Sequence, residues 1–216
     1  MSSIAKKTVQ SITGAALILF LSFHAVMNIF VIISPAAYDA ICDFLGANWY
    51  ALIGTAGLAL LVVLHFLFAI ILTVENYIAR GSERYAVSAR PAGVEWSSRN
   101  MFVLGLVVCG FIVLHLMNFW YKMQLQEILG NELAMSGAEF VQDLFSHPVY
   151  CILYMIWLVA LWFHLQHGMW SALHTLGWNN NKWIPRLKCI SNIYTGIVCA
   201  LFFCIPLYYL IVNIFA

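Results

Sequence analysis

Five long apolar stretches constrain the fold of this chain more than any other feature of its sequence. They cover residues 11–33, 49–75, 100–121, 148–173 and 189–214. Each is long enough to cross a bilayer core about 30 Å thick as a helix, which takes roughly 20 residues. The pattern predicts an all-α membrane protein, a single domain of residues 1–216 whose five transmembrane helices form a bundle.

The composition excludes several classes of protein. Hydrophobic residues make up 63% of the chain and charged residues 9%, whereas a soluble domain has about 25% charged residues. This excess of apolar surface has to face lipid, so a soluble enzyme and a disordered chain are excluded. The net charge of +1 excludes a nucleic-acid-binding protein, which needs a concentrated basic face.

The first apolar stretch follows Lys6 and Lys7, as the core of a signal peptide would. From Ile12, however, it runs for roughly 20 residues, which exceeds a signal core of about 7–15 residues. We therefore expect it to be retained as the first span.

Basic residues set the expected orientation of the bundle. Nine of the ten lie on one side: Lys6, Lys7, Arg80, Arg84, Arg90, Arg99, Lys182, Arg186 and Lys188. Lys122 lies on the other side with six of the nine acids. Because basic loops stay in the cytoplasm, we expect a multi-pass protein with its N-terminus in the cytoplasm and its C-terminus outside.

Two of the segments between spans lie on the expected outer side. Residues 34–48 are expected to form a loop that contains Cys42. Residues 122–147 carry apolar side chains at a helical spacing, which predicts a short amphipathic helix on the membrane surface. The six cysteines form no CxxC or CxxCH motif, and we expect them to be inert thiols.

Four of the five spans contain one histidine each near mid-depth. Counted from the middle of the span, His24 and His115 lie about 3 and 6 Å towards the outside. His65 and His164 each lie about 4–5 Å towards the cytoplasm. An ionisable side chain in hydrocarbon is costly and by default marks a function. Depth therefore predicts an outer and an inner histidine pair.

Two facing imidazoles suit a haem better than a bare metal ion. Zinc takes three or four protein ligands and non-haem iron takes a carboxylate as well, but no carboxylate lies near these histidines in the sequence. A haem needs only axial ligands, so we expect two bis-histidine haems that carry electrons. Gly14 and Gly105 lie ten residues before His24 and His115, on the same helix faces, where they would let a macrocycle lie close to the backbone.

His167 follows His164 by three residues. That spacing turns the side chain about 300° around the helix, so His167 and His164 cannot reach one iron from the same direction. We do not expect His167 to be a haem ligand.

Over nearly its whole length the chain resembles the dihaem cytochrome b subunit of succinate dehydrogenases and quinol:fumarate reductases, in its five-helix form. The resemblance rests on QSITG with His24 following, FHAVMN, LHFLFAI, VLHLMNF and FHLQHGMWSALHTLGW. It implies two haems b, ligated by His24 with His115 and by His65 with His164. Gly168, in the last motif, is implied to belong to a haem site.

The resemblance also implies contacts to the haem propionates. Gln10 and Ser11, at the cytoplasmic mouth of the first span, would donate hydrogen bonds to a propionate. Arg99 and His174 lie at the same depth as Gln10 and Ser11 and would supply charge-assisted hydrogen bonds to a propionate. Members of the family often have a basic residue next to the position of His174, where this chain has Thr175.

The function implied by the resemblance is electron transfer between membrane menaquinol or menaquinone and partner subunits on the cytoplasmic face. The partners would be an iron–sulfur subunit and a flavoprotein that interconverts fumarate and succinate, and the membrane would be the inner membrane of a bacterium. This chain would act as the quinone-reactive subunit and as the membrane anchor.

A quinone site needs polar groups near a haem and a route for protons. On the outer side, Asn28 is one turn beyond His24 and is expected to bind a quinone carbonyl. Asp39, Asp43 and His147 are the expected proton acceptors, with Asp43 preferred because FLGANWY follows it and leads into the second span.

Two other classes remain open at this point. A cytochrome b anchor of a hydrogenase, formate dehydrogenase or nitrate reductase also pairs histidines across a bundle, but usually concentrates them on fewer helices. A haem-free proton-coupled transporter usually has internal repeats, and none is found here.

Overall fold

Five long helices dominate the computed structural model, which describes residues 1–46, 48–80 and 95–215. Each is long and apolar enough to cross a membrane. They are α1 (Ser3–Asn28), α4 (Trp49–Arg80), α5 (Trp96–His115), α8 (Pro148–Thr175) and α9 (Trp183–Phe215). No strand occurs in these described ranges. The predicted all-α class and the five predicted spans are confirmed, although the first helix begins at Ser3 rather than at residue 11.

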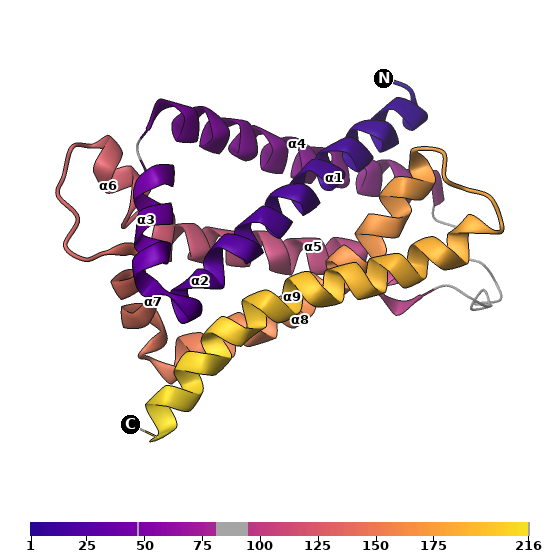
Figure 1. The fold of residues 1–216 in the computed structure, drawn as a ribbon. Helices are drawn as coiled ribbons and strands as arrows, with labels where there is room; N and C mark the ends of the chain where they lie inside the picture. Colours follow the sequence, from indigo (N-terminus) through magenta and orange to yellow (C-terminus); the bar gives the residue numbers. More distant parts are fainter. Residues whose placement is uncertain (47, 81–94, 216) are drawn as a thin grey trace.

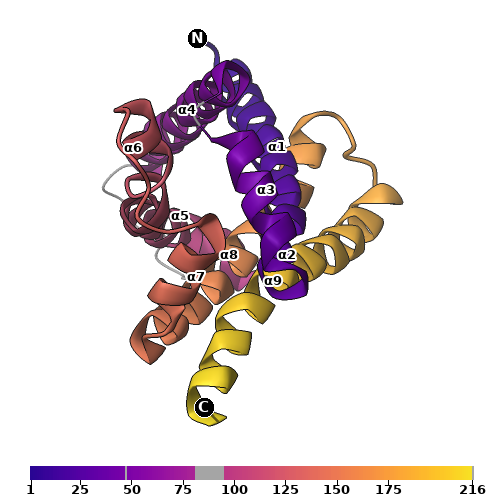
Figure 2. The same cartoon turned by 60° about the vertical axis from the view of Figure 1, so that its left-hand side comes forward.

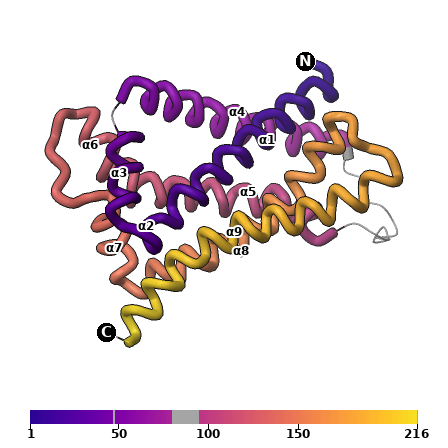
Figure 3. Tube along the Cα trace, in the orientation of Figure 1, coloured from indigo at the N-terminus to yellow at the C-terminus, as the bar shows by residue number. Residues whose placement is uncertain are grey.

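The five helices run between two ends of an elongated bundle (Figure 1 and Figure 3). One end holds the N-terminus and the connection from α8 to α9, and we call it the N-terminal end. The opposite end holds the C-terminus and the short helices, among them α7 (Gly137–Phe145), and we call it the α7 end. The termini therefore lie at opposite ends of the bundle, as an odd number of spans requires.

The helices pack unevenly around the bundle. Helix α8 contacts α9, α5 and α1, and four of its residues, Cys151, Tyr154, Leu158 and Leu161, are at most 5% exposed. Helix α4 packs chiefly against α1, and none of the residues in its apolar window is buried. Figure 2 shows α4 beside α1 and apart from α9. The second span is therefore held mainly by one neighbour.

The expected loop at residues 34–48 is largely a helix, α3 (Pro35–Leu45). Ser34 accepts a hydrogen bond from the Ala37 N–H, and Pro35 occupies the first helical position, where its missing N–H costs nothing. The prediction that Cys42 lies in a loop is wrong, because this Ser-Pro start begins a helix that includes Cys42. Helix α1 continues towards α3 through one turn, α2 (Phe30–Ile33).

Residues 122–147 form two helices, α6 (Gln124–Ile128) and α7, rather than one. A capping box of Ser136 and Glu139 starts α7, and the chain turns between the helices at Gly130, whose φ is +75°. The apolar side chains of α7 are buried against α2, α3, α8 and α9. The prediction of a single helix with its apolar face on the membrane is wrong, because α7 buries that face on the bundle.

Candidate functional site

The four mid-depth histidines lie on four helices that the fold brings together as two pairs. In the first pair, the ring centroids of His24 on α1 and His115 on α5 are 5.9 Å apart, with ring planes at 88°. In the second pair, His65 on α4 and His164 on α8 are 6.4 Å apart, with planes at 76°. These are the two pairs that depth along the spans predicts.

The centroid distance in both pairs is close to that of two imidazoles bound to opposite sides of one metal. An imidazole nitrogen lies about 2 Å from a bound metal, so two axial imidazoles on one metal place their ring centroids about 6 Å apart. The described residues contain no group of three or more His, Cys, Asp or Glu placed to hold a metal ion. Each pair thus offers two imidazoles, which is the donor set that suits a metal already held by a porphyrin.

The two predicted glycines lie against the second pair rather than against their own histidines. A Cβ built on Gly14 would be 3.1 Å from Cε1 of His65, and one on Gly105 would be 3.6 Å from Cε1 of His164. Ten residues of helix span about 15 Å, so each glycine reaches the level of the neighbouring pair. The spacing had linked each glycine to the histidine of its own helix, whereas the side chains beside them are those of the second pair. A Cβ on Gly168 would meet no atom within 4 Å.

Two side chains of α1 hold the His65 ring. The Oγ1 of Thr13 is 3.2 Å from Nδ1 of His65, and Nε2 of Gln10 is 3.3 Å from Nε2 of the same ring. Gln10 therefore contacts the histidine pair in this structure. Ser11 is buried, at 6% exposure. Thr13 was missed by sequence reasoning, although its position three residues after Gln10 puts it on the same helix face as Gln10.

An amide holds the His24 ring. Asn28 Nδ2 is 3.1 Å from Nδ1 of His24 and donates to the His24 carbonyl at 2.7 Å. The hydroxyl of Tyr38 on α3 donates to Oδ1 of Asn28 at 3.3 Å. Asn28, which was expected to bind a quinone carbonyl, is thus engaged with His24 and Tyr38. Tyr38 was also missed, because no local pattern links α3 to the last turns of α1.

The other two histidines lack such partners. Nδ1 of His115 and Nδ1 of His164 are buried, and neither has a hydrogen-bond partner among the described residues. Aromatic rings surround the first pair: Phe20 stacks on His24 at 5.3 Å, and Trp157 lies 6.4 Å from His115. Each pair therefore contains one ring held by a polar side chain and one held by packing alone.

The helix changes its winding directly after His115. Residues Leu116–Trp120 form a π-helical segment, η1, in which the Tyr121 N–H donates to the Leu116 carbonyl at 2.8 Å. Such segments are rare and often occur at functional sites. Here the wider turn carries Asn118, which donates to the Tyr154 hydroxyl at 3.1 Å beside the first pair.

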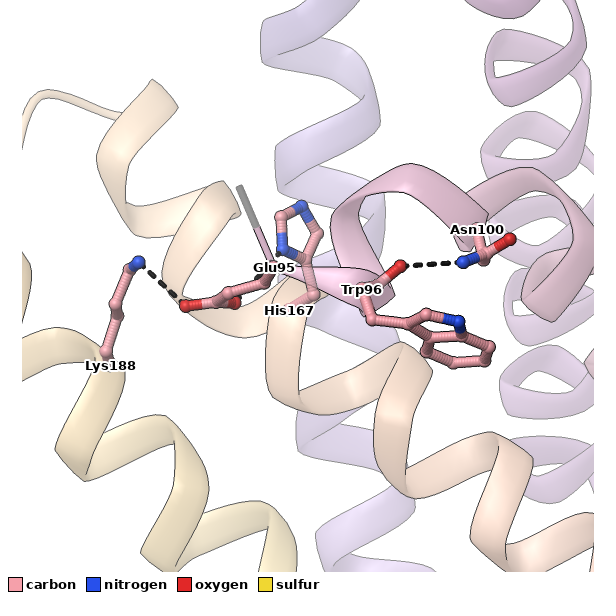
Figure 4. Close-up of polar contacts among 5 residues, drawn as sticks. All are labelled: Glu95, Trp96, Asn100, His167 and Lys188. Carbon is pink, nitrogen blue, oxygen red and sulfur yellow. Dashed lines mark hydrogen bonds and ion pairs between the residues drawn. The ribbon is translucent and has the colours of Figure 1, made fainter. Parts of the chain in front are cut away.

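A charged cluster lies at the N-terminal end, one turn from His164 (Figure 4). Glu95 accepts a hydrogen bond from Lys188 Nζ at 2.7 Å, and its other oxygen is 3.8 Å from Nδ1 of His167. Lys188 also lies over the Trp170 ring, 4.6 Å from its centroid. The cluster joins the start of α5 to α8 and α9. His167 therefore faces Glu95.

The remaining predicted residues lie near the ends of the bundle. At the N-terminal end, Arg99 and His174 are both exposed. Arg84 and Arg90 lie outside the described residues. At the α7 end, His147 is exposed and precedes the first residue of α8.

The two acids of α3 differ in their surroundings. Asp39 Oδ1 accepts a hydrogen bond from the Ala138 N–H at 2.8 Å, in the first turn of α7, where the helix dipole favours a negative charge. Asp43 is exposed. Asp39 thus has a clear structural role, and Asp43 is the acid that solvent reaches.

Burial changes the acidity of two further side chains of α3. It raises the pKa of the Tyr38 phenol and raises the pKa of the Cys42 thiol to about 11. Tyr38 therefore keeps the proton that it donates to Asn28, and Cys42 remains a neutral thiol at pH 7.

Comparison with known proteins gives no match: no family model, no curated protein and no solved structure matches this chain.

Proposed function

We propose that this chain is the dihaem cytochrome b subunit of a membrane oxidoreductase of the fumarate reductase and succinate dehydrogenase type. The observation that carries the proposal is that the fold forms two pairs of histidines, each pair joining two helices. The ring centroids are 5.9 Å apart in the first pair and 6.4 Å apart in the second, and each pair lies nearer a different end of the bundle. Four helices supply one histidine each, an arrangement for which packing of an apolar bundle gives no reason.

The residues of the chain would bind and orient the two haems. His24 and His115 would ligate one, and His65 and His164 the other. Gly14 leaves room beside the His65 ring, and Phe20 and Trp157 shield the first pair from water. Bound in this way, a six-coordinate haem supplies one-electron transfer without an open position for oxygen.

The N-terminal end would face the cytoplasm and bind the iron–sulfur and flavoprotein subunits. This end carries exposed Lys7, Arg99 and Lys182, while Lys122 is exposed near the α7 end. More basic residues at the N-terminal end than at the α7 end support this orientation, because cytoplasmic loops are enriched in Lys and Arg. Charge reversal by Lys7→Glu together with Lys182→Glu should loosen the complex, most at low salt, where exposed charges interact over longer distances.

Menaquinol would bind near the first pair, at the α7 end, and release its protons to the outside. No described span contains a carboxylate at mid-depth; Glu75 lies near the end of α4, where it pairs with Lys6. Asp43 is the exposed acid of α3 and is the proposed proton acceptor. Asp43→Asn should slow quinol oxidation and leave both haems bound; unchanged quinol turnover would exclude Asp43.

Haem content tests the proposal directly. The full chain purified from membranes should hold two haems b, measured by the pyridine haemochrome spectrum against protein mass. His24→Leu or His115→Leu should remove one haem, and His65→Leu or His164→Leu the other, whereas His167→Leu should keep both. Fewer than two haems in the unmodified chain would contradict the proposal. Co-purification of a flavoprotein would then separate this family from other cytochrome b anchors.

A further inference from the structure

The hydroxyl of Thr13 lies between the backbone of α1 and the ring of His65. Thr13 is 4% exposed. Its Oγ1 is 2.9 Å from the Val9 carbonyl oxygen, 3.1 Å from the Gln10 carbonyl oxygen and 3.2 Å from Nδ1 of His65. All three neighbours are close enough for a hydrogen bond, but the hydroxyl has only one proton to donate.

The direction of these hydrogen bonds follows from the chemistry of the groups. A carbonyl oxygen can only accept, so the hydroxyl proton of Thr13 points to the backbone, as threonine commonly does in helices. Towards His65 the hydroxyl then offers a lone pair. Nδ1 of His65 must carry the ring proton and donate it, which leaves the lone pair of the neutral ring on Nε2.

The second contact of the ring supports the same tautomer. The amide Nε2 of Gln10 is 3.3 Å from Nε2 of His65 and can only donate. With the amide in this orientation, Nε2 of the ring accepts the hydrogen bond. Both contacts are satisfied together when Nδ1 has the proton and Nε2 has the lone pair, and a metal bound at Nε2 would replace the Gln10 amide there.

We propose that Thr13 is a positioning residue that fixes His65 as the Nδ1–H tautomer and so presents Nε2 to the iron shared with His164. The inference rests on the proposed function and assigns the orienting group of one ligand. Within the second pair, Nδ1 of His164 is buried with no partner among the described residues. Thr13 is thus the polar group that sets the ring orientation and ligand basicity of this site.

An acceptor at Nδ1 makes an imidazole a stronger donor to its metal and favours the oxidised iron. Thr13→Val removes the acceptor with little change of volume, and Thr13→Ala removes it together with the side-chain bulk. Both should shift the reduction potential of the second haem to more positive values and weaken its retention by about 10–100-fold, as loss of an orienting partner does at other metal sites. Thr13→Ser keeps the hydroxyl and should restore both properties.

Thr8→Val is the matched control. Thr8 lies on the same helix, and its hydroxyl also donates to a backbone carbonyl, that of Ile4, at 3.0 Å and at an exposed position. The four variants are compared in the full chain with its haems, by potentiometric titration and by the low-temperature electron paramagnetic resonance spectrum, which reports the orientation of the axial rings. The Thr8→Val spectrum and potentials should match those of the unmodified chain.

The proposal is overturned if Thr13→Val and Thr13→Ala behave like Thr8→Val, or if Thr13→Ser shifts the second haem as far as they do. The latter outcome would assign the effect to the threonine methyl group rather than to the hydroxyl. If Thr13→Val fails to assemble, Thr13→Ala and Thr13→Ser decide the question. An unmodified chain without haem would overturn the proposed function itself. Two bound haems whose reduction potentials and retention do not change in the Thr13 variants would overturn only this inference.

Discussion

The two histidine pairs have similar ring distances but differ in how their polar side chains hold them. In the second pair, the Thr13 hydroxyl donates its proton to the Val9 carbonyl and therefore accepts from Nδ1 of His65, which leaves the lone pair on Nε2. In the first pair, Asn28 Nδ2 must donate to the His24 carbonyl, so its contact with Nδ1 at 3.1 Å is also that of a donor. His24 therefore has its proton on Nε2 in this arrangement.

If the proposed haems bind through Nε2, the second pair already has its lone pair on that nitrogen, whereas the first pair would have to change first. For His24 to bind iron through Nε2, its proton must move to Nδ1 and the Asn28 amide must turn its oxygen towards the ring. Tyr38, which now donates to that oxygen, would then meet the amide NH₂ instead. The second pair needs no such rearrangement, apart from withdrawal of the Gln10 amide from Nε2.

The largest expected effect on this comparison comes from the glycines beside the second pair. In Gly14→Ala the added Cβ would lie 3.1 Å from the His65 ring, whereas in Gly105→Ala it would lie 3.6 Å from the His164 ring, an ordinary contact. Overpacking costs about 1–3 kcal/mol, so Gly14→Ala should weaken retention of the second haem roughly fivefold or more.

Both glycine variants gain the same helix propensity, about 1 kcal/mol, so their difference isolates the contact with the ring. The difference between the variants is measured as the fraction of the second haem that is retained during dilution in detergent. The first haem serves as the internal reference. Equal retention in Gly14→Ala and Gly105→Ala would show that the ring of His65 moves freely away from Gly14.

A smaller effect is expected at the first pair, where Asn28 holds His24. Asn28→Asp places a carboxylate that can only accept, which favours the proton on Nδ1 and a more basic ligand. The potential of the first haem should therefore fall. Asn28→Leu leaves Nδ1 of His24 without an acceptor and should raise the reduction potential of the first haem. A redox titration that resolves both haems measures the shifts, and the second haem should stay unchanged. Shifts of the same sign in both variants would contradict this role of Asn28.

Sequence reasoning predicted the spans and the histidine pairs because both depend on periodicity along single helices. A run such as 148–173 is apolar on all sides, and the depth of His164 follows from counting residues. The partners of the rings were harder to predict. The spacing from Gln10 places Thr13 on the same face of α1, but a threonine hydroxyl usually bonds to its own backbone, so the sequence alone did not identify it as a partner of His65. Tyr38 reaches Asn28 only because Ser34 and Pro35 start a helix where a loop was expected.

The smallest expected effect concerns the two ion pairs at the N-terminal end. Glu95 pairs with Lys188 and also faces His167, and Glu75 pairs with Lys6 between α4 and α1. All these side chains are partly exposed, and such pairs contribute about 0–1 kcal/mol each. Glu95→Gln should lower the thermal unfolding midpoint in detergent more than Glu75→Gln, because it removes two contacts that join α5, α8 and α9 rather than one.

Salt separates the charge contribution from packing in this last comparison. At high ionic strength the exposed pairs are screened, so the unmodified chain should approach both variants. The contact of Lys188 with the Trp170 ring at 4.6 Å does not need Glu95 and should persist in Glu95→Gln. A Glu95→Gln midpoint that stays low at high salt would instead assign the loss to the hydrogen bond between Lys188 and Glu95 and to the packing around it, and would place this cluster among the groups that hold α8 near the second pair.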